Sequence, residues 1–128
     1  MHQITSHKVA GNEKNELFIA VTDAPDPQGG AHHDYHVYTT PDPHGTQYCE
    51  SIVEIHFQNG PIPANGINGV TNEVLLALVK DRLECFQAGK FACAENEAAL
   101  AYVTEALEIL KGRTRDRIAR QVEGQYKV

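Results

Sequence analysis

The chain has 128 residues, of which 41% are hydrophobic and 22% charged, and its formal net charge is −6. This size predicts one compact domain, residues 1–128, for which oligomerisation often adds stability. Residues 1–11 hold no apolar signal-peptide core, and no apolar run approaches the roughly 20 residues that cross a bilayer, so we expect a soluble, intracellular protein without a membrane partner. Three cysteines without a C-x-x-C pair argue against a disulfide framework and a cysteine zinc site.

The β-rich part of the chain, residues 17–69, follows an N-terminal segment of residues 1–16. Short β-like runs at 17–22, 36–40 and 51–57 are separated by loops rich in Pro and Gly at 23–30 and 41–45. In the third run Val53, Ile55 and Phe57 alternate with mostly polar residues. This alternation predicts an antiparallel sheet that is buried on one face.

The pattern becomes helical over residues 70–122, and a tail of residues 123–128 follows. A first helix is capped by Thr71 or Asn72 and ends at Gly89, which we expect in a left-handed conformation. Its apolar stripe runs through Leu75, Leu78, Val79, Leu83 and Phe86. A second helix begins near Cys93, with a stripe of Ala99, Val103, Ala106 and Leu110 and with Leu100 and Leu107 alongside it. The predicted fold class is α+β, a small N-terminal antiparallel β-sheet packed with a C-terminal two-helix hairpin.

Four of the five arginines lie between positions 113 and 120. With Asp116 this segment carries +3, so the remaining residues carry −9. A compact basic site on an acidic protein indicates a small anionic ligand and argues against long nucleic acid, which needs a broad positive face.

Continuing the stripe of the second helix past Leu110 leads to Arg113, Arg117 and Arg120, whereas Arg115 points elsewhere. This prediction requires the helix to continue through Gly112, where a kink is an alternative. The arginines are either a solvated face that pairs with Glu105, Glu108 or Glu123, or a clamp for phosphate. Arg suits phosphate because its planar donors bind two oxygens at once.

Other chemistry has less support in the sequence. The histidines of the first half are interpreted as turn and surface residues and not as metal ligands, although one arrangement of them could bind a metal: His32, His33, His36, His44 and His56. The carboxylates of the loops are interpreted as turn formers, although they could act as general acids or bases: Asp23, Asp26, Asp34 and Asp42. No nucleophile elbow or phosphate loop is present, so we expect no enzyme activity, no metal and no cofactor.

Two residues near the helix turn could read a nucleotide. Phe86, like Phe91, offers a ring for stacking on a base, although core packing is its alternative. Asn96 carries an amide that could bind a base or ribose edge, although it could equally be a polar first-turn residue.

Several motifs resemble the first-described type of Thoeris anti-defence nucleotide sponges, which share a helical hairpin with sponges that counter CBASS. The resemblance rests on residues 55–61, 68–76, 82–89, 95–96, 113–117 and 122–124. It implies a phage protein in the cytoplasm of an infected bacterium that sequesters glycocyclic ADP-ribose without cleaving it. Some members of the family assemble as hexamers and bind cyclic trinucleotides in a second pocket. Because tight binding requires an enclosed ligand and a small domain offers little enclosure, we expect a homo-oligomer, a dimer or a hexamer, with the ligand near subunit interfaces.

Carried over by position, the resemblance implies that Phe86 stacks on the ligand, Asn96 hydrogen-bonds it, and Arg113 and Arg117 hold its phosphates. It places Phe86 and Asn96 beside the arginine stripe. Thr114, Arg115 and Arg120 are further candidates, and residues 112–115 are candidates for the second pocket. A nucleotide-processing enzyme and a structural or partner-binding phage protein are the alternative functions.

Overall fold

The chain forms two compact units, residues 1–70 and 71–128, which are described separately below. The computed structural model describes residues 2–12, 16–39 and 50–122. Strands occupy the first unit and the two long helices the second, which confirms the predicted α+β class. The division lies one residue from the position where the sequence pattern changes from β-like to helical.

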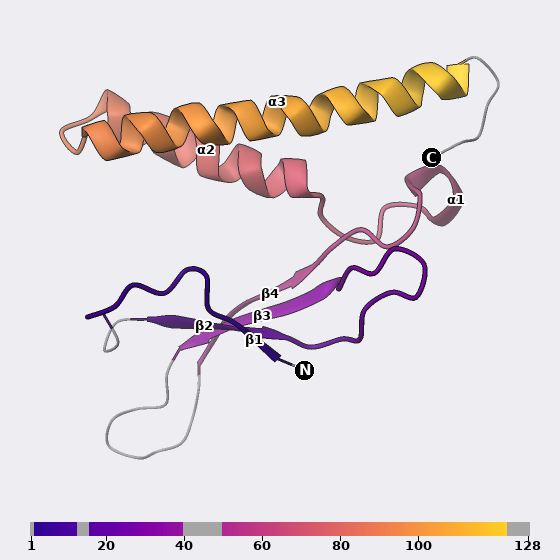
Figure 1. Ribbon diagram of the computed structural model, residues 1–128, viewed down its shortest axis with the longest axis horizontal. Coiled ribbons are helices and arrows are strands. Elements are labelled where there is room, and N and C mark those ends of the chain that lie inside the picture. Colours follow the sequence, from indigo (N-terminus) through magenta and orange to yellow (C-terminus); the bar gives the residue numbers. More distant parts are fainter. Residues whose placement is uncertain (1, 13–15, 40–49, 123–128) are drawn as a thin grey trace. The chain divides into compact units, whose positions relative to one another are not determined.

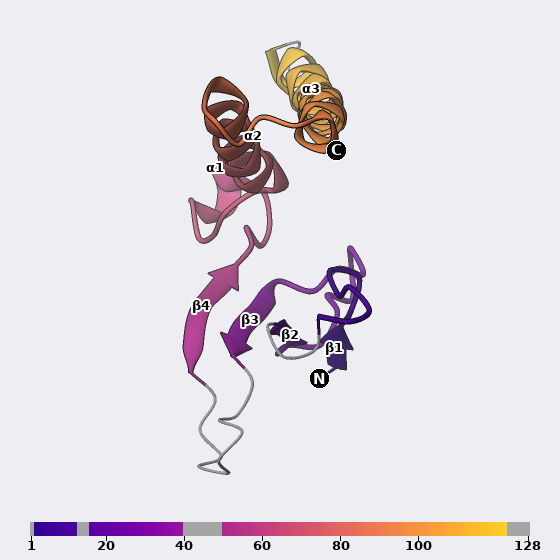
Figure 2. The same ribbon diagram turned by 90° about the vertical axis from the view of Figure 1, so that its left-hand side faces the viewer.

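The first unit contains a four-stranded antiparallel sheet in the order β1-β2-β3-β4, the same order as in the sequence (Figure 1). The strands are β1 (His2–Ile4), β2 (Leu17–Val21), β3 (Asp34–Thr39) and β4 (Ser51–His56). Figure 2 shows β3 and β4 side by side along the sheet. The three predicted strands are confirmed. The sequence did not predict β1, because three residues are too few for an alternating pattern to be recognised.

The pairing of the strands separates the sheet into an apolar and a polar face. Ile4, Ile19, Val37 and Val53 lie opposite one another across the four strands, and Val21, Tyr35 and Ile55 form a second row on the same face. The other face carries Gln3, Ala20, His36 and Glu54 in one row. The predicted alternation in β4 is therefore confirmed. Val21, which is 1% exposed, is the most deeply buried side chain of the described residues.

A compact loop connects β4 to the second unit and contains a short helix, α1 (Ile62–Asn65). The Gln58 amide donates to the carbonyls of Gly60 and Gly66 and accepts from the Asn68 N–H. Asn68 in turn accepts from the Asn59 N–H at 2.7 Å. The sequence indicated only turns here, because four helical residues form no apolar stripe.

The end of this loop returns to β4. The Val70 N–H donates to the His56 carbonyl, and the Val70 carbonyl accepts from the Gln58 N–H, both at 2.8 Å. Gly69 lies against the same backbone, since a Cβ there would be 2.5 Å from the His56 oxygen and 2.6 Å from the Phe57 oxygen. A side chain at position 69 is therefore excluded by backbone atoms that cannot rotate away.

The second unit is an antiparallel hairpin of α2 (Asn72–Ala88) and α3 (Ala94–Val122). Thr71 caps α2 by accepting the Val74 N–H at 3.2 Å, as predicted. Gly89 ends α2, but its φ of −112° is extended, so the predicted left-handed conformation is wrong. Its N–H donates to the Phe86 carbonyl, which ends the helix without a left-handed residue.

Helix α3 continues without interruption through Gly112, so the alternative of a kink there is wrong. Its inward positions are Leu107, which is 9% exposed, and the half-buried Leu100, Val103 and Leu110. Of the predicted stripe, Val103, Ala106 and Leu110 are half-buried as expected, whereas Ala99 is exposed. The next inward residues after Leu110 are Thr114 and Arg117, and Arg113 is exposed.

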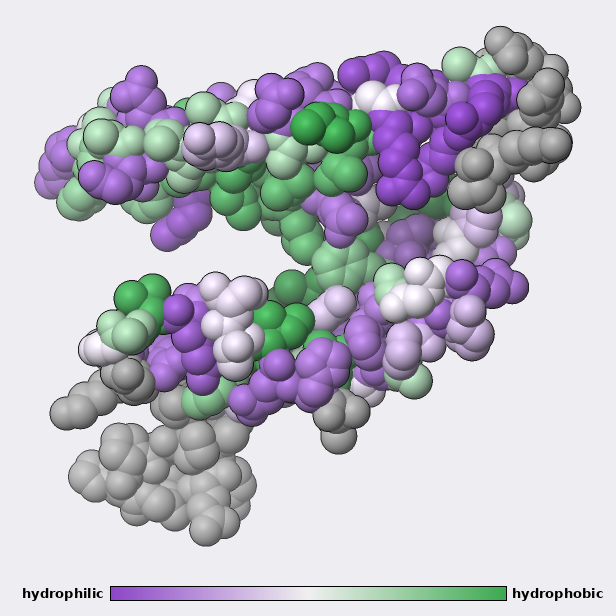
Figure 3. Space-filling view, in the orientation of Figure 1, coloured by the Kyte–Doolittle hydropathy of each residue, from purple (hydrophilic) through white to green (hydrophobic). Residues whose placement is uncertain are grey.

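The hairpin has more apolar residues than two helices can bury against each other. Leu78 was expected to face inward but is 64% exposed, because α2 contains four large apolar residues between positions 75 and 79. Tyr102 and Ile109 of α3 are 78% and 62% exposed. In Figure 3 hydrophobic surface alternates with hydrophilic surface along this unit. Despite these residues, no described helix combines the length and the apolar character that a membrane span requires.

Replacing Gly69 with Ala is expected to destabilise the protein by about 1–3 kcal/mol, because the added Cβ overlaps backbone atoms of β4. Gly29→Ala is the matched control in the same unit, since a Cβ at Gly29 meets nothing within 4 Å, and we expect a change within about 0.5 kcal/mol. Urea denaturation at equal protein concentrations measures both. Equal stability of the two variants would contradict the close approach of Gly69.

Candidate functional site

The arginines of the 113–120 segment lie on the last turns of α3, and their exposure differs along the helix. Arg117 and Arg120 are half-buried, whereas Arg113 and Arg115 are exposed. The Nε atom of Arg120 is shielded from solvent and has no hydrogen-bond partner in the part of the chain that the structure describes. The predicted outward position of Arg115 is confirmed. The predicted inward position of Arg113 is wrong, because Thr114 occupies that place in the stripe.

Only one arginine of this segment pairs with a described carboxylate. Arg115 Nη2 lies 3.9 Å from Glu108 Oε2, and Lys111 Nζ lies 3.0 Å from Glu108 Oε1. The hydrogen bond from Lys111, with smaller effects of Lys111, Arg115 and Lys80 charges, lowers the pKa of Glu108. Glu123 lies outside the described residues. Within residues 2–12, 16–39 and 50–122, neither Arg113 nor Arg117 has a carboxylate at ion-pair distance.

Thr114 connects the two helices at the end where α2 begins. Its hydroxyl lies 3.3 Å from the Leu110 carbonyl and 3.5 Å from Glu73 Oε2, and its single proton can be shared between these acceptors. Glu73 is in the first turn of α2, where the positive end of the helix dipole stabilises a carboxylate. Thr114 is therefore engaged within the hairpin, and no sequence signal pointed to Glu73.

Phe86 and Asn96 lie at the opposite end of the hairpin, beside the turn between the helices. The Phe86 ring packs edge to face with Phe91, with centroids 6.3 Å apart, and the Arg82 guanidinium lies over it at 5.0 Å. The Asn96 N–H donates to Cys93 Sγ at 3.4 Å, which caps the first turn of α3. Phe86 and Asn96 are both half-buried. The sequence analysis missed Arg82, although its position four residues before Phe86 on one helix was a usable signal.

These two groups cannot share one small ligand within a single chain. Asn96 and Arg113 are 17 positions apart on one unbroken helix, which corresponds to about 26 Å, and the 21 positions from Asn96 to Arg117 correspond to about 32 Å. The expectation that Phe86 and Asn96 lie beside the arginines is therefore wrong within one chain. These distances hold because α3 is one continuous helix from Asn96 to Arg117.

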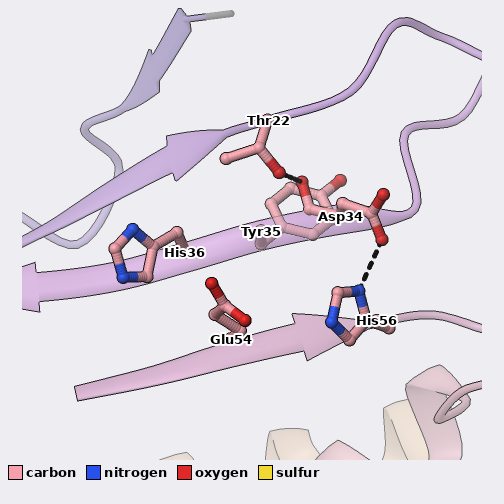
Figure 4. Close-up of a pocket in the computed structure, with 6 residues that line it drawn as sticks. All are labelled: Thr22, Asp34, Tyr35, His36, Glu54 and His56. Carbon is pink, nitrogen blue, oxygen red and sulfur yellow. Dashed lines mark hydrogen bonds and ion pairs between the residues drawn. The ribbon is translucent and has the colours of Figure 1, made fainter. Parts of the chain in front are cut away.

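The polar face of the sheet holds the histidines and carboxylates of β3 and β4 (Figure 4). A shallow pocket there is lined by Thr22, Asp34, His36, Glu54 and His56, together with Tyr35, which belongs to a row of the apolar face. His56 Nδ1 lies 2.7 Å from Asp34 Oδ1, and this hydrogen bond, followed by the charges of Asp34 and Glu54, raises the pKa of His56. His36 Nε2 lies 2.8 Å from the Ser51 hydroxyl. The Asp34–His56 pair can hold a proton.

The loop carboxylates before β3 organise the backbone. Asp23 accepts the N–H groups of His33 and Asp34 at 2.8 and 3.1 Å, and the His33 bond is the main cause of its lowered pKa. Asp26 accepts the Gln28 N–H at 2.8 Å, which lowers its pKa most, with a further contribution from His33. These contacts agree with their interpretation as turn formers. His32 Nδ1 contacts the Asp23 carbonyl at 2.8 Å.

The described part of the chain contains no set of side chains arranged to bind a metal ion. No group of three or more His, Cys, Asp or Glu side chains there is placed to hold an ion. Asp42, His44 and the loop 41–45 lie outside the described residues.

Comparison with known proteins identifies the hairpin and the strand before it. The family described as the Acb2/Tad1 hairpin domain matches residues 50–113, half of the chain. The chain belongs to this family. A relative named Thoeris anti-defense 1, from Bacillus phage SBSphiJ7, is 42% identical over 79 residues, which are 62% of this chain and 56% of the relative. The match thus spans just over half the length of that relative.

The extent of the Acb2/Tad1 hairpin domain matters for the candidate residues. The matched range begins at β4, includes α1 and α2, and ends at Arg113 within α3. Phe86, Asn96 and Arg113 fall inside it, whereas Arg117 and Arg120 lie beyond it. The family match therefore says nothing about Arg117 and Arg120, which are candidates because of the arginine pattern alone.

The His56–Asp34 pair is expected to make stability depend on pH. Because the pKa of His56 is raised on folding, its contribution is fully present below the ordinary value of about 6.5 and is lost as pH rises through the folded value. His56→Gln should therefore lower the urea midpoint at pH 5.5 more than at pH 8.5. A parallel loss at both pH values would mean that the charged pair does not contribute.

Proposed function

We propose that the protein is a phage anti-defence protein that binds and sequesters a cyclic nucleotide immune signal. The proposed signal is glycocyclic ADP-ribose, and its removal blocks Thoeris-type immunity in the cytoplasm of the infected bacterial host. Family membership and the name of the phage relative support this function. The coverage of that relative is partial, so the support comes chiefly from the hairpin.

The observation that carries the proposal is that Arg113 and Arg117 are not paired with a carboxylate among the described residues. Both lie on one continuous helix of an acidic protein, and neither has a carboxylate partner among the described residues, whereas nearby Lys111 and Arg115 both contact Glu108. An arginine without an internal partner retains its donors for an external anion. Its planar guanidinium matches two phosphate oxygens, which a pyrophosphate-containing ligand supplies.

The separation along α3 favours a ligand site made by two copies of the chain. If two hairpins pair in antiparallel fashion, Phe86 and Asn96 of one copy come near Arg113 and Arg117 of the other. The exposed Leu78, Tyr102 and Ile109 offer apolar surface for such an association. We propose a homo-oligomer, a dimer or a hexamer, with the ligand between subunits.

Sequestration requires tight binding and no chemistry. A Kd of 1 nM corresponds to about −12.3 kcal/mol, which a single exposed ion pair does not supply. Enclosure between two subunits removes water and strengthens the contacts of the arginines. The enzyme alternative relied on the loop His and Asp residues, and Asp23 and Asp26 are engaged in backbone hydrogen bonds. We therefore propose a protein that binds without catalysis.

A second pocket for cyclic trinucleotides is also part of the proposal. Its candidates are residues 112–115, with Arg120 nearby on the same helix. The Thr114 hydroxyl is shared with Glu73 in this structure, so a ligand at this position would have to compete with that contact. Among the described residues, Glu108 at 3.9 Å is the only carboxylate at ion-pair distance from the exposed guanidinium of Arg115.

Mixing the protein with glycocyclic ADP-ribose should deplete the free ligand, and heat denaturation of the protein should release the ligand intact. Chromatography and mass spectrometry of the supernatant measure both steps. Undepleted ligand contradicts binding, whereas recovery of a cleaved or altered product contradicts sequestration and supports the enzyme alternative.

Arg113→Ala and Arg117→Ala should each weaken binding by about 1.5–3 kcal/mol, because a charged hydrogen bond to phosphate is lost. Lys111→Ala is the matched control, since it removes the same charge from the same helix at a residue already paired with Glu108. Calorimetric titration with glycocyclic ADP-ribose measures the affinities. Unchanged affinity in both arginine variants would exclude them from the site and favour the partner-binding alternative.

Coexpression tests whether this site spans two chains. An oligomer mixed from Phe86→Ala and Arg113→Ala chains contains some interfaces with both wild-type residues, so a fraction of its sites should bind ligand with the wild-type affinity that each variant alone lacks. If both residues act within one chain, no mixture restores a complete site. The absence of restored binding would therefore contradict the intersubunit arrangement while leaving the single-variant results intact.

A further inference from the structure

The turn of the hairpin carries a cluster of two cations and two aromatic rings. Arg82 lies over the Phe86 ring with its Cζ atom 5.0 Å from the centroid, and Lys90 Nζ lies 5.7 Å from the centroid of Phe91. The two rings meet edge to face. A guanidinium over an aromatic face is attracted by the negative charge density of the ring, so Arg82 restrains the Phe86 ring.

The positive charge of Arg82 is not neutralised within the described residues. Glu84 pairs with Lys80 at 3.0 Å, and Asp81 accepts a contact from the Cys85 thiol at 4.0 Å. No described carboxylate lies at ion-pair distance from Arg82, and its side chain is on an exposed residue of α2. Arg82 thus shares the property that distinguishes Arg113 and Arg117, but it lies at the other end of the hairpin.

We propose that Arg82 is a further residue of the nucleotide site, an inference that rests on the proposed function. It holds the Phe86 ring for stacking on a base and supplies a permanent positive charge that attracts the phosphates of the same ligand. The physical reason is the combination at one place of a flat apolar surface for a base and an unpaired cation for an anion. A purine nucleotide presents both groups within one small molecule.

The role of Arg82 predicts a specific order among its variants. Arg82→Ala and Arg82→Gln should each weaken binding of glycocyclic ADP-ribose about tenfold, whereas Arg82→Lys, which keeps the charge, should recover most of the affinity. Lys80→Ala is the matched control, because it removes one charge from α2 at a residue that already pairs with Glu84, and its Kd should remain within about twofold.

Two further measurements separate this role from a structural one. If Arg82 attracts phosphate, the dependence of log Kd on log salt concentration should be shallower in Arg82→Gln than in the wild type, since fewer charges take part. If it also acts through the ring, removing it should cost less affinity in a Phe86→Leu background than in the wild type. A residue needed only for helix stability would change neither quantity.

The outcomes distinguish this inference from the proposed function. A wild-type protein that does not bind the ligand would overturn both. A wild-type protein that binds, with Arg82→Gln matching Lys80→Ala in Kd and salt dependence, would overturn the role of Arg82 alone. Arg82→Lys serves as the folded reference if Arg82→Ala proves unstable, and weak binding by Arg82→Lys at unchanged thermal stability would contradict the role of the charge.

Discussion

The antiparallel packing of α2 against α3 is the constraint on which the candidate site depends. The Glu73–Thr114 contact and the cap at Thr71 lie at one end of the hairpin, and Phe86, Phe91 and Cys93 lie at the other. Because α3 has 29 residues and α2 has 17, the last turns of α3 extend past the start of α2. The aromatic end and the arginine end are thereby held apart at a separation that one small ligand cannot bridge.

The exposed apolar residues of the hairpin are explained if two hairpins associate, which the separation of the two ends also favours. A two-helix hairpin has one shared interface, and here Leu107 is the only buried residue among the described residues of that unit. Leu78, Tyr102 and Ile109 remain in solvent in a single chain, which is unfavourable by the hydrophobic effect. Association of hairpins would bury them and would bring the two ends of different chains together. In the proposed oligomer, the same contacts between hairpins would both stabilise the protein and enclose the ligand.

The distribution of charge follows the same division. Two lysines of the hairpin are neutralised locally, Lys80 by Glu84 and Lys111 by Glu108, whereas Lys90, Arg82, Arg113 and Arg117 have no described carboxylate partner. Local pairs along a helix arise from spacings of three and four residues and contribute little to recognition. In the sheet, by contrast, histidines and carboxylates contact each other or the backbone, as in His56–Asp34 and Asp23–His33. The groups that remain available for an anion are therefore mainly arginines of the hairpin.

The sequence by itself determined the α+β class, three of the four strands, both long helices and the cap at Thr71, because each has a local pattern of polarity or a local hydrogen bond. It also singled out Arg113, Arg117 and the outward Arg115. It could not determine whether α3 passes through Gly112, and it placed Ala99 and Arg113 on the inward face although both are exposed, since α2 and α3 offer several apolar stripes of similar strength. Which stripe is buried depends on the partner helix. Only the tertiary structure therefore decided that Thr114 faces Glu73, that Arg82 lies over Phe86, and that the aromatic and arginine groups are at opposite ends of the hairpin.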